Sequence, residues 1–372
     1  MRKPFKVQQA AVYRCSLLAA LIAAVVVFSA MGLRAQNQSE KPPTAKNAIH
    51  VHVNEVVLPV TVTDQKGELV LDLRSKDFHV LDAGVEQKIR TMSLDPEPLS
   101  LVLVIETSSH IQSLMPLIHK NAIVFAEQVV AMESEAAVIK YDSTVKVLQP
   151  FTSDHESIEK AISQTDAVED GFKLYDALAK SEALLATEQA NRRRVILVIG
   201  ESQDSGSAAK LSDVVRTAQH ENISLYSIGL SSSAAEFKSG DVAPLKLGKD
   251  APPISTTPPP ADARGDQFFD IATPALWLVG RATNEISNRR FSTTISATGG
   301  IHYTALTTAS MSHALDKIGA ELRSQYILTY ALDGERSPGF NEIKVTVSRP
   351  HLTVRTRAGY FLTQPDLLHI TP

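Results

Sequence analysis

Five consecutive aliphatic residues, Leu-Val-Leu-Val-Ile, stand at positions 101–105 of the chain. A strand that is apolar at every position is typical of a parallel sheet with helices on both faces. Short apolar strands alternate with amphipathic segments after it, which predicts an α/β fold with a doubly wound, mostly parallel, Rossmann-like sheet. Further strands are expected at residues 136–141, 144–148, 195–199, 223–230 and 301–304, and helices at residues 111–132, 157–163, 175–186, 211–218, 274–287 and 310–323.

Two β-rich segments flank this α/β region. Apolar and polar residues alternate over residues 58–63, as in a half-buried strand. The pattern predicts a small antiparallel β unit at 49–97, with further strands at 78–82 and near residue 87. The α/β domain is then expected at 98–324, with a proline- and serine-rich insertion at 231–266. A second antiparallel β unit is expected at 325–363, with strands at 326–330, 342–347 and 352–357, and residues 364–372 form a tail.

Residues 1–35 have the order of a secretory signal peptide. Basic residues come first, an uncharged apolar stretch follows at 15–33, and Ala35 is the expected last residue removed. Because the apolar stretch approaches the length that spans a bilayer, an uncleaved membrane anchor is the alternative. Either way the sequence predicts a protein that is secreted or held in the periplasm or cell envelope, with residues 36–48 as a linker.

Charge and cysteine content narrow the classes of partner and site. Removing residues 1–35, which carry five basic and no acidic residues, changes the net charge from −4 to −9. An acidic protein lacks the clustered cations that bind phosphate backbones, so no nucleic-acid partner is expected. The single cysteine, Cys15, lies in the leader. The exported chain is therefore expected to have no disulfide and no cysteine-ligated metal.

A polar loop follows the apolar strand, with the sequence Glu106-Thr107-Ser108-Ser109-His110. The carboxyl ends of strands in open α/β sheets are where ligands bind. The loop resembles the Asp-x-Ser-x-Ser loop of von Willebrand factor A domains, which holds a divalent cation. Residues 170–178 resemble the Gly-Gly-Thr-x-Leu-Tyr-Asp-Ala helix start of that family, and residues 198–202 resemble the strand end that delivers its last aspartate.

The chain outside this domain resembles a narrower group, the VWFA-related exported proteins of acidobacteria. The resemblance rests on residues 62–67 and 77–89 near the amino terminus and on residues 321–326 and 354–360 near the carboxyl terminus. It implies an exported protein with a von Willebrand factor A-type domain. It implies no particular activity, because that group has no well-defined biochemical role.

The aligned cation ligands are largely replaced in this sequence. Glu106 and Glu201 stand where the family has aspartate, His110 replaces a serine, Phe172 replaces a threonine, and Ser108 is retained. Magnesium needs oxygen ligands in a near-octahedral arrangement that tolerates little displacement. The sequence therefore predicts a degenerate, empty site. The alternative is a rebuilt site in which Glu106, His110 and Glu201, with Asp204, hold a softer cation.

The resemblance implies a non-catalytic protein that binds a protein partner of unknown identity, without a cofactor. A fold hosts many roles, so this step rests on analogy. Two alternatives stay open. A serine hydrolase would use Glu106, Ser108 and His110, which are the residue types of an acyl-transfer triad but lie close together in sequence. A structural subunit of an envelope assembly would need no site.

Overall fold

A computed structural model describes residues 55–94, 98–130, 133–167, 169–188, 192–230, 284–332 and 338–363, with side chains for all of these except 284–290. The predicted leader (1–35), linker (36–48), insertion (231–266) and tail (364–372) lie outside the described residues. Within the described ranges, no helix combines the length and the apolar character needed to cross a bilayer.

A six-stranded sheet forms the centre of the α/β domain, in the order β10-β9-β8-β5-β6-β7. Every neighbouring pair is parallel except β6 and β7, which are antiparallel. All eight residues of β5 are buried, as the continuous apolar run predicted. The doubly wound, mostly parallel sheet is confirmed. Its strands are β5 (Leu99–Glu106), β6 (Glu135–Tyr141), β7 (Val145–Thr152), β8 (Arg193–Gly200), β9 (Ile223–Gly229) and β10 (His302–Thr304).

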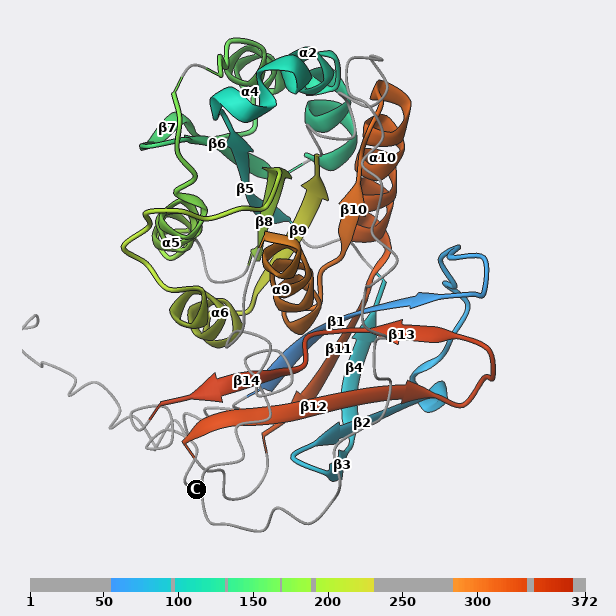
Figure 1. The fold of residues 1–372 in the computed structure, drawn as a ribbon. Coiled ribbons are helices and arrows are strands. Elements are labelled where there is room, and N and C mark those ends of the chain that lie inside the picture. The colour runs from blue at the N-terminus through green and yellow to red at the C-terminus, as the bar shows by residue number, and fades with distance from the viewer. Residues whose placement is uncertain are drawn as a thin grey trace, which may run out of the picture. The chain divides into compact units, whose positions relative to one another are not determined.

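Helices cover both faces of this sheet (Figure 1). They are α2 (Met115–Lys120), α3 (Ala122–Val124), α4 (His155–Ser163), α5 (Leu174–Leu185), α6 (Leu211–His220), α9 (Asn284–Ala297) and α10 (Thr308–Ser324), with short turns of helix at η2 (Ser109–Leu114) and η3 (Phe125–Val129). A further short turn, η1 (Ser75–Asp77), lies outside this domain, directly before β2. Leu101, Leu103 and Ile105 pack with α2, α3, η3, α4 and α10, whereas Val102 and Val104 pack with α5, α6 and α9. Alternate side chains of β5 thus enter two separate cores.

The single helix predicted at residues 111–132 is wrong. This segment is divided into η2, α2, α3 and η3. Pro116 stands in the first turn of α2, where a missing N–H costs nothing. Asn121 ends α2, and its amide donates to the carbonyl of Leu117 at 2.8 Å. The side chain competes for a backbone group that a continuous helix would use, so the helix breaks there.

Two four-stranded antiparallel sheets share one further core, in the orders β13-β1-β11-β4 and β14-β12-β2-β3. The first predicted β unit supplies β1, β2, β3 and β4, and the second supplies β11, β12, β13 and β14. The two units interleave, since β1 pairs with β11 and β2 pairs with β12. The strands are β1 (Glu55–Thr63), β2 (Phe78–Asp82), β3 (Val85–Gln87), β4 (Ile89–Ser93), β11 (Tyr326–Ala331), β12 (Gly339–Val347), β13 (Thr353–Arg355) and β14 (Gly359–Leu362).

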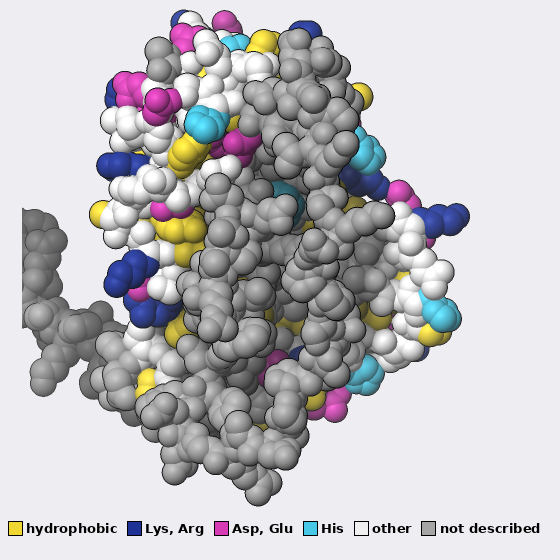
Figure 2. Space-filling model, viewed as in Figure 1, with side chains coloured by type: hydrophobic (Ala, Val, Ile, Leu, Met, Phe, Trp, Pro, Cys, Tyr) yellow, Lys and Arg dark blue, Asp and Glu magenta, His cyan; other side chains and the backbone are white. Residues whose placement is uncertain are grey.

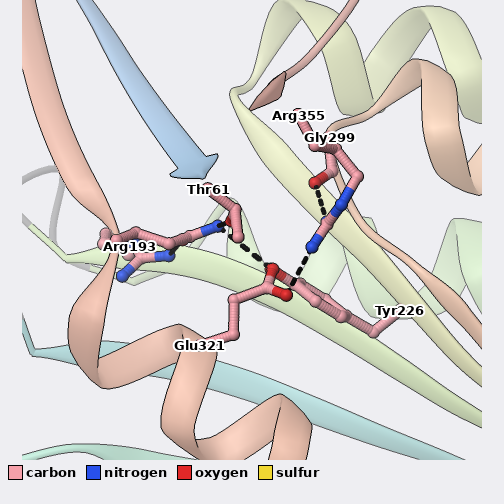
Figure 3. A network of polar contacts seen from close by, with 7 residues as sticks. Thr61, Arg193, Tyr226, Gly299, Glu321 and Arg355 are labelled. Carbon is pink, nitrogen blue, oxygen red and sulfur yellow. Dashed lines mark hydrogen bonds and ion pairs between the residues drawn. The ribbon is translucent and has the colours of Figure 1, made fainter. Parts of the chain in front are cut away.

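A buried polar network joins the α/β domain to these two sheets (Figure 3). Glu321 of α10 is only 4% exposed and forms an ion pair with Arg355 of β13. Its carboxylate also accepts from the Tyr226 hydroxyl at 2.6 Å and from the Gln325 amide at 3.2 Å. The same amide donates to the hydroxyl of Thr61 on β1 at 2.8 Å. Each buried charge thus has a partner, which makes its burial tolerable.

Candidate functional site

The predicted site lies at the carboxyl ends of the parallel strands. The arrowhead of β9 points away from the two antiparallel sheets, and the strands parallel to it end at the same edge (Figure 1). Isolated bridges join Ser108 to Glu169 and Phe172 to Ser205, so the three predicted segments meet here. The meeting point is called the rim below and comprises residues 106–110, 169–176 and 200–209.

Glu106 is the most enclosed ionisable residue of the rim, with an exposed fraction of 0%. Three donors point at its carboxylate. They are the Ser108 hydroxyl at 2.6 Å, the Tyr141 hydroxyl at 3.2 Å and the backbone N–H of Glu201 at 2.6 Å. Burial raises the pKa of Glu106, and the bonds from Ser108 and Glu201 oppose that shift. The side chain fastens the end of β5 to the end of β8.

The space for this carboxylate depends on Gly200, the last residue of β8. A Cβ atom placed on Gly200 would lie 2.5 Å from Glu106 Oε2 and 2.8 Å from the Tyr141 hydroxyl oxygen. Any side chain at position 200 would therefore displace Glu106 or Tyr141. Tyr141 is itself fully buried, and burial raises its pKa well above the ordinary value, so it stays a neutral donor.

Ser108 and His110 do not act on each other in this arrangement. Ser108 is fully buried and donates its hydroxyl to Glu106. His110 is exposed, and its ring packs edge-on against Phe172 with 4.9 Å between ring centroids. The described residues show no hydrogen bond between Ser108 and His110.

Asp204 accepts a hydrogen bond from the first turn of helix α5. Its carboxylate accepts from the backbone N–H of Tyr175 at 2.9 Å and from the Ser207 hydroxyl at 2.6 Å. Asp176 reaches back and accepts from the backbone N–H groups of Ala208 and Ala209 at 2.9 and 2.8 Å. Burial raises the pKa of Asp204. These reciprocal bonds tie the loop after β8 to α5 and satisfy N–H groups that a helix start leaves open.

The rim as it is arranged does not present the oxygen ligands that magnesium prefers. The carboxylate of Glu106 already accepts three hydrogen bonds and that of Asp204 accepts two, so both are held by the protein itself. Phe172 offers no donor atom. In the part of the chain that the structure describes, no three His, Cys, Asp or Glu side chains converge in the manner of a metal site.

The sequence predicted Glu106, Ser108, His110 and Glu201 as site residues but not their neighbours Tyr141 and Gly200. Glu106 and Glu201 meet directly, and Glu201 is 7% exposed. Tyr141 stands opposite Glu106 in the parallel register of β5 and β6, and Gly200 follows Ile199, which stands opposite Ile105. Tyr141 is the last residue of the strand predicted at 136–141, and Gly200 directly follows the strand predicted at 195–199, but neither position indicates a contact with Glu106.

Residues 100–244 match the family model of the von Willebrand factor type A domain. Among solved structures, the conserved hypothetical protein BatB from Bacteroides thetaiotaomicron is 14% identical, with 60% of this chain and 98% of that chain covered and a TM-score of 0.38. A von Willebrand factor type A protein from Catenulispora acidiphila is 8% identical, with coverages of 84% and 75% and a TM-score of 0.43. The comparison with curated proteins gives no match.

Proposed function

We propose that this von Willebrand factor A-type protein is an exported, non-catalytic binding protein of the VWFA-related group, and that its rim takes a protein partner without a cation. One observation carries the proposal. The carboxylate that would hold a cation in the family is instead enclosed by three hydrogen-bond donors, from Ser108, Tyr141 and the backbone of Glu201. The same contacts support the proposal that the cation site is degenerate.

The exposed part of the rim offers an aromatic surface for contact with a partner, in place of a bound cation. His110 is exposed and Phe172 is half-buried, and the two rings form an edge-to-face pair. Aromatic side chains are enriched at the centres of protein interfaces because they bury large areas with little loss of conformational freedom. Figure 2 shows basic and acidic side chains interspersed over the described part of one face, which favours a protein partner over a polyanion.

The absence of catalysis is part of the proposal. A serine nucleophile needs a base within hydrogen-bond reach and access to substrate. Ser108 is fully buried and donates to Glu106, while the ring of His110 lies against Phe172. A fluorophosphonate probe should leave Ser108 unmodified, and labelling at this residue would establish the hydrolase alternative.

The binding proposal is tested by capture from an envelope extract of the source organism. The tagged chain should retain the same captured protein in EDTA, since no cation is required. Phe172→Ala and His110→Ala should each reduce capture by roughly tenfold or more, as expected for central aromatic contacts.

The matched control is Val85→Ala, an exposed apolar residue on β3 that is 58% exposed and far from the rim in sequence. It should leave capture unchanged. Loss of capture in EDTA, or full capture by Phe172→Ala, would contradict the proposal. Amino-terminal sequencing of the exported product tests the leader, with residue 36 expected as the first residue.

A further inference from the structure

A second candidate site lies where the α/β domain meets the antiparallel sheets. A cleft of about 780 Å³ is lined by residues of β1 and the turn after it, the end of α9 and the segment that follows it, β10, α10 and β13. This volume falls within the range of small-molecule pockets, roughly 300–1,000 Å³. The cleft is distinct from the rim, because none of its lining residues belongs to the three rim segments.

The floor of the cleft is electrically balanced. Glu321 and Arg355 both line it, and they form the buried ion pair described above. Arg355 also donates to the carbonyl of Gly299 at 2.6 Å. Figure 3 shows the Glu321 carboxylate directed at Arg355 and Tyr226. The acid in the floor is therefore already neutralised and would not repel an anion.

The outer part of the cleft carries excess positive charge. Lys66 and Lys317 line it together with a single acid, Glu68. Lys317 forms an ion pair with Glu68 at 2.9 Å, in which the side chain of Glu68 is 66% exposed. Lys66 forms no ion pair with any residue that the structure describes. The lysines and arginine that line the cleft outnumber its acids by three to two, and the charge of Lys66 also acts on the nearby Asp64 carboxylate.

The ion pair between Lys317 and Glu68 can be displaced. Exposed pairs of this kind contribute about 0–1 kcal/mol, because solvent screens them and two long side chains must be held still. An anion that enters the cleft can take the place of the Glu68 carboxylate beside Lys317 at little cost. Glu68 is then a competitor for the ligand.

The uncharged lining indicates an organic ligand. Leu69 and Ile301 supply apolar surface, and Thr63, Thr353 and Tyr303 supply hydroxyl groups. An inorganic anion would fill only a small part of this volume and leave the apolar surface in contact with water. A ligand with a carbon skeleton would cover it and gain the free energy of that burial.

We propose that this cleft binds a small organic anion bearing at least one carboxylate, with Lys66 and Lys317 as its cationic anchors and Glu68 displaced from Lys317 on binding. The proposal is independent of the function assigned to the rim.

Titration calorimetry on the full chain at low ionic strength tests this, with succinate, citrate and glucuronate as probes and inorganic phosphate as the comparison. At least one organic anion should bind and phosphate should not. Binding should weaken as salt is added, because the anchors are partly exposed. No heat from any of the three organic anions, or equal affinity for phosphate, would overturn the proposal.

Three variants and a control test the residues. Lys317→Gln and Lys66→Gln should each weaken binding by about tenfold, the effect of losing one good charge contact. Glu68→Gln should tighten binding by about threefold, since it removes the competitor. Lys344→Gln, an exposed lysine on β12, is the control and should change nothing. Thermal melts verify that each variant is folded. Unchanged binding in both lysine variants, or weaker binding in Glu68→Gln, would also refute the assignment.

Discussion

Glu182 is a buried carboxylate whose ionisation should oppose folding. It lies on α5 with 6% exposure, and its Oε1 atom has no hydrogen-bond partner among the described residues. Burial, together with the charge of Glu221, raises its pKa from 4.5 to about 8. The folded state therefore holds this proton more tightly than the unfolded state does. The contribution of Glu182 to stability should be greatest below pH 4.5 and fall as the pH rises toward 8.

The size of this effect follows from the shift. One pKa unit corresponds to about 1.36 kcal/mol, so ionisation of the unfolded state between pH 4.5 and 7 costs about 3 kcal/mol of unfolding free energy. Glu182→Gln keeps the shape and removes the charge. It should raise the unfolding free energy at pH 7 by about 1–3 kcal/mol, since the new amide is also buried without an evident partner.

Urea denaturation of both proteins at pH 5, 6, 7 and 8 measures the difference. It should grow with pH up to about 8 and then level off. The control is Glu127→Gln, an exposed residue on η3, for which no pH-dependent difference is expected. A difference between Glu182→Gln and the natural protein that stays constant from pH 5 to 8 would refute the reasoning.

Three further changes test the packing of the rim and the buried network. Gly200→Ala should destabilise the protein by about 1–3 kcal/mol because its Cβ meets the Glu106 carboxylate at 2.5 Å, and adding Glu106→Asp should recover part of this loss in urea denaturation. Arg355→Leu should cost about 3–5 kcal/mol because Glu321 is left buried and unpaired, whereas the double variant with Glu321→Met should be markedly more stable than Arg355→Leu alone. A combined variant, Glu106→Asp, His110→Ser, Phe172→Thr and Glu201→Asp, restores the residue types of the family's cation ligands. It should bind magnesium in a calorimetric titration, whereas the natural protein should not.

The sheet was predictable because its signal is local. The fully apolar run of β5 implies burial on both faces whatever the rest of the chain does, and β5 is buried at all eight positions. The break at Asn121 was not predictable, because it depends on one side chain bonding to the carbonyl of Leu117. The strand β14 was not predicted either, because it has only four residues, too few for an alternating pattern to be recognised.

The candidate site was also predictable only in part. Because parallel strands end at one edge, the sequence predicts that Glu106 and Glu201 meet, and the backbone of Glu201 donates to Glu106 at 2.6 Å. The sequence does not indicate where the Glu106 carboxylate points. That depends on Tyr141, which is opposite Glu106 in the strand register, and on the absence of a side chain at Gly200. Contacts fixed by register between distant strands have no local signal.

The Glu106 carboxylate connects separate segments of the rim. It accepts hydrogen bonds from Ser108, from Tyr141 at the end of β6 and from the N–H of Glu201 after β8. Rim order should therefore not depend on metal. Hydrogen exchange at the Glu201 amide should be the same with and without EDTA. It should become about tenfold faster in Glu106→Ala, corresponding to the loss of a hydrogen bond of roughly 1.4 kcal/mol. Faster exchange of the natural protein in EDTA would show that a cation, and not Glu106, holds the rim together.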